Sequence, residues 1–319
     1  MSDTVAVVPT LGWSPRLAET LAALRADGGA RLETVVVWQG EASPPRELAA
    51  DRLLTSVANL GFSGAINLAL ADGDAPFVAL VNDDATVEPG WLAAMHAGLD
   101  EAREVAAVQG VNLLDDGTTT DRIDGCGLAW NNAWQAVQVG RSAPALAPTA
   151  SPFEVFGVSA TAALYRREAL LDASLRPGEL LDASLFAYYE DVDLACRLRG
   201  RGRSALCVPA ARARHLGSVS GDRMGDRRWI WIHAHRLLVL ARLLGRRFWP
   251  RLPRLLLRDL ADTLSPRAAR PGPAALGAAW RAAWRLLPRF ARRGPSLVPL
   301  AELARFRVGS DGWPPRPSR

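Results

Sequence analysis

The chain has 319 residues, and nearly half of them are hydrophobic, which is enough for one large α/β domain with an appendage or for two modest domains. The formal net charge is +5, but residues 221–319 hold 21 arginines against six acidic residues, so the part before them is acidic overall. No run of about 18 uncharged apolar residues occurs, and residues 1–10 lack the basic and apolar regions of a signal peptide, so we expect neither a transmembrane helix nor a signal peptide.

Three cysteines, Cys126, Cys196 and Cys207, are too few and too irregularly spaced for a disulfide framework or a metal cluster. They predict a reducing compartment in which the thiols act as small core residues. The basic C-terminal region, in contrast, predicts an anionic partner, either a membrane surface or a nucleic acid.

The N-terminal segments predict a strand, a helix and a second strand, which is how a nucleotide-binding α/β half begins. Residues 4–8 form an apolar, β-branched run that ends at Pro9-Thr10. Ser14-Pro15 supplies the N-cap and first residue of a helix that Gly28-Gly29 closes. Residues 32–38 form the second buried strand, and Gln39-Gly40 is its turn.

A glycine-rich stretch, residues 59–67, follows a candidate third strand at residues 53–57 and leads into a helix that continues to Leu70. Glycines let the backbone approach a ligand closely, and a helix start offers free N–H groups to an anion. The spacing is not the dinucleotide fingerprint G-x-G-x-x-G, so a nicotinamide enzyme is not favoured.

Residues 78–84, Val-Ala-Leu-Val-Asn-Asp-Asp, are an apolar run of strand length that ends in an amide and two carboxylates. A buried strand tolerates no unpaired charge, so Asp83 and Asp84 are expected just past its C-terminal end, where open α/β sheets bind ligands. Carboxylates at this position suit a hard divalent cation that also holds phosphate oxygens. The alternative is a polar turn that only stops the strand.

The middle of the chain continues the alternation of helices and strands. We expect a helix at residues 91–99, a strand at 105–111, an extended excursion over the active face at 125–139, a flexible loop at 143–152 and a buried strand at 156–165.

A second acidic cluster lies at residues 186–194, where Glu190, Asp191 and Asp193 follow three aromatic residues at a predicted helix N-terminus. Helix capping accounts for one or two of these carboxylates. A desolvated carboxylate has a raised pKa and can act as a base toward a hydroxyl. His215 follows a short predicted strand at residues 205–208, and it is either a structural histidine or a metal ligand.

In this order and spacing, the pieces resemble the family 2 inverting glycosyltransferases of the GT-A fold, especially the rhamnosyltransferase-like branch. The resemblance covers roughly residues 4–240 and is carried by Pro9-Thr10, 59–67, Asn82-Asp83-Asp84, 157–167, Glu190-Asp-Val-Asp-Leu194 and 215–220. It implies an α/β fold with a mixed sheet flanked by helices, in which residues 1–220 form the catalytic domain. Residues 221–319 would then form a basic, amphipathic helical region.

The resemblance also implies roles for individual residues. Asp191 would be the general base with Glu190 beside it, and Asp84 with His215 would hold Mg²⁺ or Mn²⁺. The predicted nucleotide-sugar contacts are Pro9, Thr10, Gln39, Asn59, Asn67, Asn82 and Asp83. The family usually has an acidic residue at the end of the second strand, where this chain has Trp38-Gln39, so the base stays open between uridine and deoxythymidine.

The expected function is therefore inverting transfer of a sugar, with L-rhamnose from dTDP-rhamnose first, to a hydroxyl of a polyprenyl-diphosphate-linked or cell-envelope glycan acceptor. The runner-up is a UDP-sugar donor, such as UDP-galactofuranose. A non-catalytic scaffold that binds a membrane or a polyanion is the alternative from another class.

The C-terminal region places apolar residues in stripes at helical spacing, with arginines between them. The stripes are Ile230, Trp231, Leu237, Leu238 and Leu244; Leu252, Leu256, Leu260 and Leu264; and Leu276, Trp280, Trp284 and Leu287. Arginine and tryptophan on amphipathic helices predict a peripheral position on an anionic membrane, here the cytoplasmic face of the cell membrane. The stripes could instead dock on the catalytic domain or on a second subunit in a homo-oligomer. Nucleic acid is not an expected partner, because the aromatic residues lie within the apolar stripes.

Overall fold

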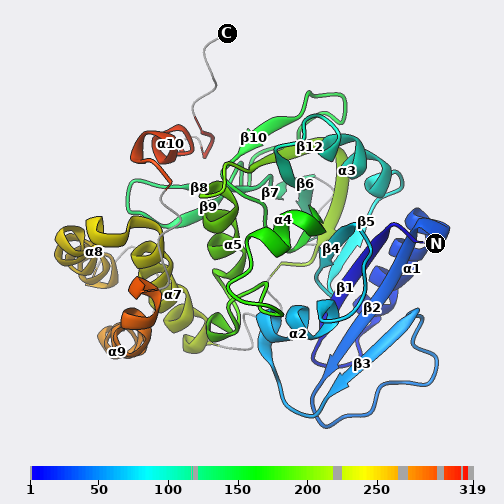
Figure 1. Cartoon of the computed structure of the whole chain (residues 1–319), viewed down its shortest axis with the longest axis horizontal. Helices are drawn as coiled ribbons and strands as arrows, with labels where there is room; N and C mark the ends of the chain where they lie inside the picture. The colour runs from blue at the N-terminus through cyan, green and yellow to red at the C-terminus, as the bar shows by residue number, and fades with distance from the viewer. Residues whose placement is uncertain are drawn as a thin grey trace.

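A ten-stranded mixed sheet forms the centre of the computed structural model, which describes residues 2–115, 117, 121–217, 225–264, 272–292, 298–309 and 312–314 (Figure 1). Its strands are β1 (Thr4–Thr10), β2 (Leu32–Gln39), β3 (Arg52–Ser56), β4 (Phe77–Val81), β5 (Ala85–Val87), β6 (Val105–Leu114), β7 (Ile123–Gly125), β10 (Phe153–Val155), β11 (Ala162–Arg166) and β12 (Ser204–His215). Their order in space is β10-β12-β6-β11-β4-β1-β2-β3, with β5 beside β12 and β7 beside β6. Strands β1 to β4 are parallel, whereas β11 runs antiparallel between β4 and β6. The predicted mixed sheet is confirmed.

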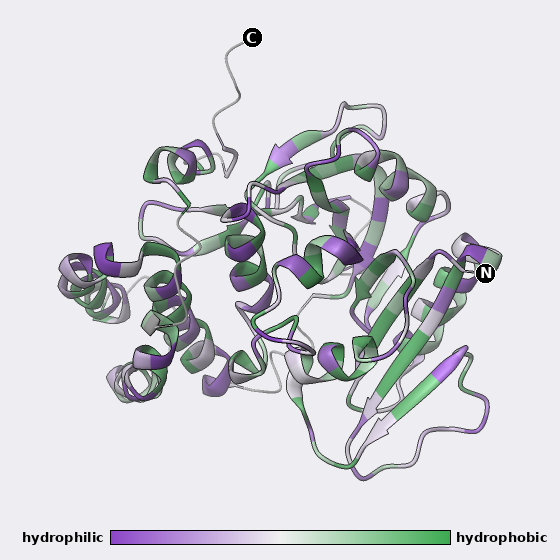
Figure 2. Cartoon of the chain, viewed as in Figure 1, coloured by the Kyte–Doolittle hydropathy of each residue, from purple (hydrophilic) through white to green (hydrophobic). Residues whose placement is uncertain are grey.

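Helices cover both faces of this sheet. They are α1 (Pro15–Gly28), α2 (Gly61–Leu70), α3 (Trp91–Leu99), α4 (Arg167–Asp172) and α5 (Glu190–Arg199), with short 3-10 turns η1 (Gly29–Arg31) and η2 (Ala183–Leu185). Successive strand side chains point to opposite faces, so Ala6 and Val8 share a core with α1 and α3, while Val5 and Val7 share another with α2, α4 and α5. Figure 2 shows the central strands as mostly hydrophobic, as burial on both faces requires.

Most predicted element ends match the structure. Ser14 is the N-cap of α1, since its hydroxyl accepts the Leu17 N–H at 3.1 Å, and Pro15 is the first helical residue. The buried, free cysteines are core thiols as expected.

Two strand predictions need correction. The strand expected at residues 156–165 begins only at Ala162, because polar Ser159 and Thr161 line a cavity and the Ser159 N–H is held by the Gln109 side chain at 2.7 Å. The short strand expected at residues 205–208 extends through His215, which is therefore its last residue.

The predicted excursion at residues 125–139 is a small hairpin of β8 (Leu128–Trp130) and β9 (Ala136–Gln138). Leu128, Val137 and Gln138 contribute to the wall of the cavity described below, so the hairpin does lie over the active face.

The C-terminal region is helical, as predicted. Its elements are α7 (Asp226–Leu244), η3 (Gly245–Arg247), η4 (Trp249–Arg251), α8 (Leu252–Leu264), α9 (Pro273–Arg292) and α10 (Leu300–Arg305). Helix α7 packs between α5 and α9 (Figure 1) and shares one hydrophobic core with β8 and α5. The predicted boundary after residue 220 lies outside the described residues, and the two-domain division stays a prediction.

The apolar stripes divide between protein contacts and the surface. Leu237, Leu238, Leu244, Leu276 and Leu287 are buried, as the docking alternative requires. Leu260, Leu264 and Trp284 are exposed and remain free to meet another partner. Within the described part of the chain, no helix has the length and hydrophobicity needed to cross a bilayer.

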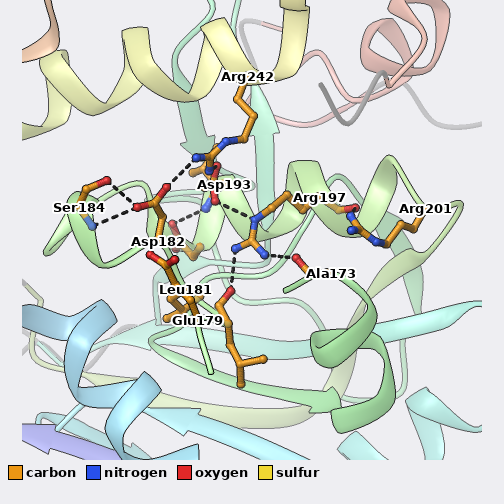
Figure 3. A network of polar contacts seen from close by, with 12 residues as sticks. Ala173, Glu179, Leu181, Asp182, Ser184, Asp193, Arg197, Arg201 and Arg242 are labelled. Atoms are coloured by element: carbon orange, nitrogen blue, oxygen red, sulfur yellow. Dashed lines mark hydrogen bonds and ion pairs between the residues drawn. The ribbon is translucent and has the colours of Figure 1, made fainter. Parts of the chain in front are cut away.

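A buried arginine fastens α7 to α5 and to the segment before η2 (Figure 3). Arg242 is 1% exposed; its guanidinium donates to Asp193 of α5 and, at 2.6 Å, to Asp182. Asp193 also accepts from Arg197 at 2.9 Å, and both aspartates are fully buried. Burial alone would raise the pKa of Asp182, but hydrogen bonds from Arg242 and Ser184 hold that pKa below its usual value. The arginines and carboxylates of this network therefore compensate one another, and removal of one partner leaves a buried charge with fewer counter-ions.

We predict that Arg242→Met lowers the free energy of unfolding by about 3–5 kcal/mol, because it leaves Asp182 with only the longer 3.5 Å contact to Arg289 and removes one of the two arginines paired with Asp193. Urea denaturation measures this value. Arg258→Met, which removes an exposed arginine from α8, is the control and should change stability by less than about 0.5 kcal/mol. Equal effects of the two substitutions would contradict the role assigned to Arg242.

Candidate active site

A cavity of about 470 Å³ opens at the carboxyl ends of β1, β2 and β4. This is the edge at which open α/β sheets bind ligands. Nearly all of the predicted site residues line it: Pro9, Thr10, Gln39, Asn59, Asn82, Asp83, Asp84, Glu190, Asp191 and His215. The two acidic clusters, which are more than a hundred residues apart in the sequence, thus face one space.

The first acidic cluster lies just beyond β4. The Thr10 hydroxyl donates to Asp83 at 2.7 Å, which ties the end of β1 to the end of β4. Burial raises the pKa of Asp83 to about 6, with the charge of Asp84 adding to the shift. Asp84 Oδ1 lies 3.2 Å from His215 Nε2, so these two side chains meet although their strands are not neighbours in the sequence.

His215 lies between two carboxylates. Its Nε2 faces Asp84, and its Nδ1 is 2.8 Å from Asp124 Oδ2. Burial alone would lower the pKa of His215, but hydrogen bonds to Asp124 and Asp84 raise that pKa to about 9. Asp124 in turn accepts from Arg141 at 2.6 Å.

Asp124 and Arg141 were not predicted as site residues. Asp124 is a single acid within the short apolar run of β7, and Arg141 is one arginine in a loop. The only available signal was a carboxylate inside an otherwise buried segment, which sequence reasoning did not weigh. Asp124 occupies the position of a carboxylate that orients a metal-ligating histidine.

The donor atoms at Asp84 and His215 suit a divalent cation. One carboxylate oxygen and one imidazole nitrogen converge on the cavity, and Mn²⁺ accepts both donor types. Among the residues that the structure describes, no group of three or more His, Cys, Asp or Glu side chains forms a complete metal site. A cation held here would therefore take its remaining ligands from phosphate oxygens and water.

The second acidic cluster begins α5, after a loop with unusual backbone geometry. Phe186, Tyr188 and Tyr189 all have positive φ, a conformation that non-glycine residues adopt at a cost of about 1–3 kcal/mol each. This loop directs Glu190 and Asp191 into the cavity. The Tyr189 hydroxyl accepts the Ala136 N–H at 3.1 Å, so the hairpin helps hold the loop.

Both carboxylates of this cluster are harder to ionise than in water. Burial raises the pKa of Asp191, while hydrogen bonds from Val192, Ala160 and Ser159 oppose the shift. Burial and the charge of Asp191 raise the pKa of Glu190 well above its usual value. A carboxylate whose pKa is raised toward neutrality is a stronger proton acceptor, which is the property that a general base needs.

The glycine-rich turn at residues 59–67 packs against the backbone of this loop. Gly61 has φ +70°, and a Cβ atom there would lie 2.4 Å from the Phe186 carbonyl oxygen. The Ser63 N–H donates to the same oxygen at 3.1 Å. The glycines at this turn therefore let the backbone of residues 59–67 approach the loop that precedes Asp191.

Asn67 is the one predicted donor contact that does not line the cavity. Its amide group donates to Leu181 O at 2.8 Å and accepts from the N–H groups of Leu180 and Leu181 at 3.0 and 2.9 Å. Because these bonds occupy both ends of the amide, Asn67 fastens α2 to the segment before η2, and its contact with the nucleotide sugar stays a prediction.

Gln39 and Asn59 line the cavity, and their side chains also accept hydrogen bonds from the backbone of the glycine-rich turn. Gln39 Oε1 accepts the Leu60 N–H at 2.8 Å, and Asn59 Oδ1 accepts the Gly61 N–H at 2.9 Å. Trp38 is buried, and its indole N–H donates to Ala42 O, so it packs in the core.

Helix α7 adds residues that sequence reasoning had assigned only to the basic region. Arg228 and Ile232 line the cavity, and the Arg228 guanidinium lies 5.6 Å from the Tyr188 ring centroid. His235 Nδ1 is 2.9 Å from Tyr188 O. Helix α7 therefore forms one wall of the site and supports the loop before Asp191.

Comparisons with known proteins agree with this geometry. Residues 2–230 match the model of the family described as glycosyltransferase-like family 2. No curated protein matches the chain in sequence.

Among three similar solved structures, the first has a TM-score above 0.5 and shows a likeness in fold. The crystal structure of GalNAc-T7 with UDP, GalNAc and Mn²⁺ has 15% identity and a TM-score of 0.59; the match covers 79% of this chain and 50% of that one. The mannosyltransferase PcManGT from Pyrobaculum calidifontis, in complex with GDP-Man and Mn²⁺, has 16% identity and a TM-score of 0.48 over 90% and 75% of the two chains. Residues 1–349 of S. aureus TarS have 17% identity and a TM-score of 0.48 over 91% and 83%. This chain thus spans half the length of GalNAc-T7.

We predict that Gly61→Ala lowers the free energy of unfolding by about 2–3 kcal/mol, because it adds a clash with the Phe186 carbonyl to the strain of positive φ. Thermal or urea denaturation measures the loss. The matched control is Gly90→Ala, where φ is +87° but no atom lies within 4 Å of the added carbon, so only the backbone strain is added. If Gly90→Ala proved as destabilising as Gly61→Ala, the contact between the turn and the loop would not matter.

Proposed function

Because the chain belongs to the family described as glycosyltransferase-like family 2, we propose that it transfers a sugar from a nucleoside diphosphate to a hydroxyl group of an acceptor. The observation that carries the proposal is the shared cavity of Asp84 and Asp191. In this proposal, Asp84 holds a cation at the diphosphate and Asp191 faces the incoming hydroxyl.

The donor is proposed to lie along the carboxyl ends of β1, β2 and β4. Pro9, Thr10, Gln39 and Asn59 line the inner part of this edge, and the amide of Gln39 can both donate and accept hydrogen bonds at a base. Asn82 and Asp83 continue the wall toward the metal position. The donor proposed first is dTDP-rhamnose, with a UDP-sugar such as UDP-galactofuranose second.

Asp84 and His215 are proposed to hold Mn²⁺ or Mg²⁺. Bound there, the cation would offset the negative charge that develops on the leaving nucleoside diphosphate. Asp124 would keep His215 oriented through Nδ1, and Arg141 keeps Asp124 in place.

Asp191 is proposed to accept the proton of the acceptor hydroxyl as that oxygen forms its bond to the anomeric carbon. The bond from the anomeric carbon to the diphosphate oxygen breaks in the same step, so the configuration inverts. Glu190 lies beside Asp191, and burial together with the charge of Asp191 raises the pKa of Glu190. Hydrogen bonds from Ser159 and Val192 orient the Asp191 carboxylate.

The acceptor is proposed to be a lipid-linked or cell-envelope glycan, met at the cytoplasmic face of the membrane. The exposed leucines and tryptophans of the C-terminal helices support this placement, since they lie beside arginines on amphipathic helices. The carboxylates in the shared cavity argue against a scaffold without catalytic activity, because a scaffold has no need for them.

We predict that Asp191→Asn lowers kcat by about 10²–10⁴, the usual contribution of a general base, while donor affinity changes little. A radiolabelled sugar-transfer assay and donor titration measure the two quantities. Near-full activity in a folded Asp191→Asn protein would contradict the assignment of the base.

We also predict that a nucleoside diphosphate stabilises the protein against heat only together with a divalent cation, because Asp84 and His215 supply two of the ligands. A thermal-shift panel of dTDP, UDP and their sugars, with and without Mn²⁺, measures this and identifies the base. Asp84→Asn should abolish the cation-dependent part of the shift. An unchanged shift in Asp84→Asn would place the cation elsewhere.

A further inference from the structure

An apolar groove of about 440 Å³ lies among α7, α8 and α9, and none of its lining residues belongs to the catalytic cavity. Its floor and walls include Leu237, Leu252, Leu256, Leu287, Trp280 and Trp284. We call it the α8–α9 groove. Its volume is within the range of sites that bind small molecules.

Apolar surface continues around this groove. Trp284 on its wall is 64% exposed, and Leu260 and Leu264, which continue the Leu252–Leu256 stripe of α8, are 37% and 63% exposed. Single exposed leucines are common, but a group of large apolar side chains beside a groove marks a binding surface. These large apolar side chains are therefore exposed and are not covered by the described helices.

Positive charge borders the groove on α9. Arg281 and Arg285 line the groove itself. The described acidic residues of α8 are Asp259, which is buried against Arg236, and Asp262, which lies beside Arg258; α9 has none. The occupant should therefore combine an apolar chain with a negative charge.

We infer that the α8–α9 groove holds one hydrocarbon chain of an anionic membrane phospholipid, with Arg281 and Arg285 at the phosphate. The inference deepens the membrane part of the proposed function and rests on it. Tryptophan and arginine suit this position, because the indole ring and the arginine stem pack on a chain while the guanidinium reaches the headgroup. A second copy of the chain fits less well, because it would bring the same arginines against these ones.

The test uses decyl phosphate below its critical micelle concentration, titrated into the full-length protein by calorimetry. We expect saturable binding at one site. Trp284→Gln and Leu256→Glu should each weaken this binding about tenfold or more, because they remove apolar contact from the groove.

Leu257→Glu is the matched control for Leu256→Glu. It adds the same charge at the next residue of α8, but Leu257 does not line the groove, so affinity should stay within about twofold. Trp284→Gln keeps the test decisive if Leu256→Glu does not fold, because Trp284 is largely exposed. Decanol, which lacks the phosphate, should bind at least about tenfold more weakly, since it cannot pair with the arginines.

A second measurement compares sedimentation with phosphatidylglycerol and phosphatidylcholine vesicles. We expect binding to the anionic vesicles, and Trp284→Gln should reduce it. Four outcomes would each overturn the inference. They are the absence of saturable decyl phosphate binding, equal losses in Leu256→Glu and Leu257→Glu, decanol binding as tight as decyl phosphate, and a dimer that buries the groove. The Mn²⁺-dependent thermal shift with nucleoside diphosphates should be unchanged in Trp284→Gln. This control separates failure of the groove inference from failure of the proposed glycosyltransferase function.

Discussion

The buried ion network around Arg242 is the interaction on which the catalytic arrangement depends. It joins α7, which follows the mixed sheet in the chain, to Asp193 of α5 and to Asp182 before the loop that leads to Asp191. Buried carboxylates and guanidinium groups tolerate little displacement, because a shift weakens the ion pairs that compensate their charges. The same helix supports Tyr188 through His235 and contributes Arg228 to the cavity wall. The C-terminal helices therefore take part in building the site, whatever else their outer surface contacts.

Within this frame, the cavity separates two kinds of carboxylate by their surroundings. Asp84 faces His215, whose other nitrogen is held by Asp124, and this pair offers an oxygen and a nitrogen to a cation. Asp191 is half-buried beside Glu190 and accepts hydrogen bonds from Ser159 and Val192; desolvation raises its pKa while these bonds fix its orientation. Such a division, with one acid for a cation and another for a proton, is what sugar transfer from a diphosphate requires.

Much of this could be predicted from the sequence, because the informative signals were local. The strand ends at Thr10, Gln39 and Val81, and the helix start at Glu190, followed from apolar runs that stop at polar residues. What the sequence could not show were contacts set by the tertiary fold. Asp124 reaches His215 only because β7 and β12 both pair with β6, and the Asn67 amide turns to backbone groups more than a hundred residues away. Likewise, the periodicity of the C-terminal stripes could not tell which leucines meet protein and which meet solvent, since both kinds share the same spacing.

The central claim is that one cavity holds a cation at Asp84 and an acceptor hydroxyl at Asp191. Anomalous diffraction from crystals soaked with MnCl₂ and a nucleoside diphosphate tests it most directly. The account predicts a manganese peak between the Asp84 carboxylate and His215 Nε2, with the diphosphate on the cation and Asp191 facing the open space beyond its terminal phosphate. A manganese peak at any other place, or a nucleotide bound outside this cavity, would contradict the account.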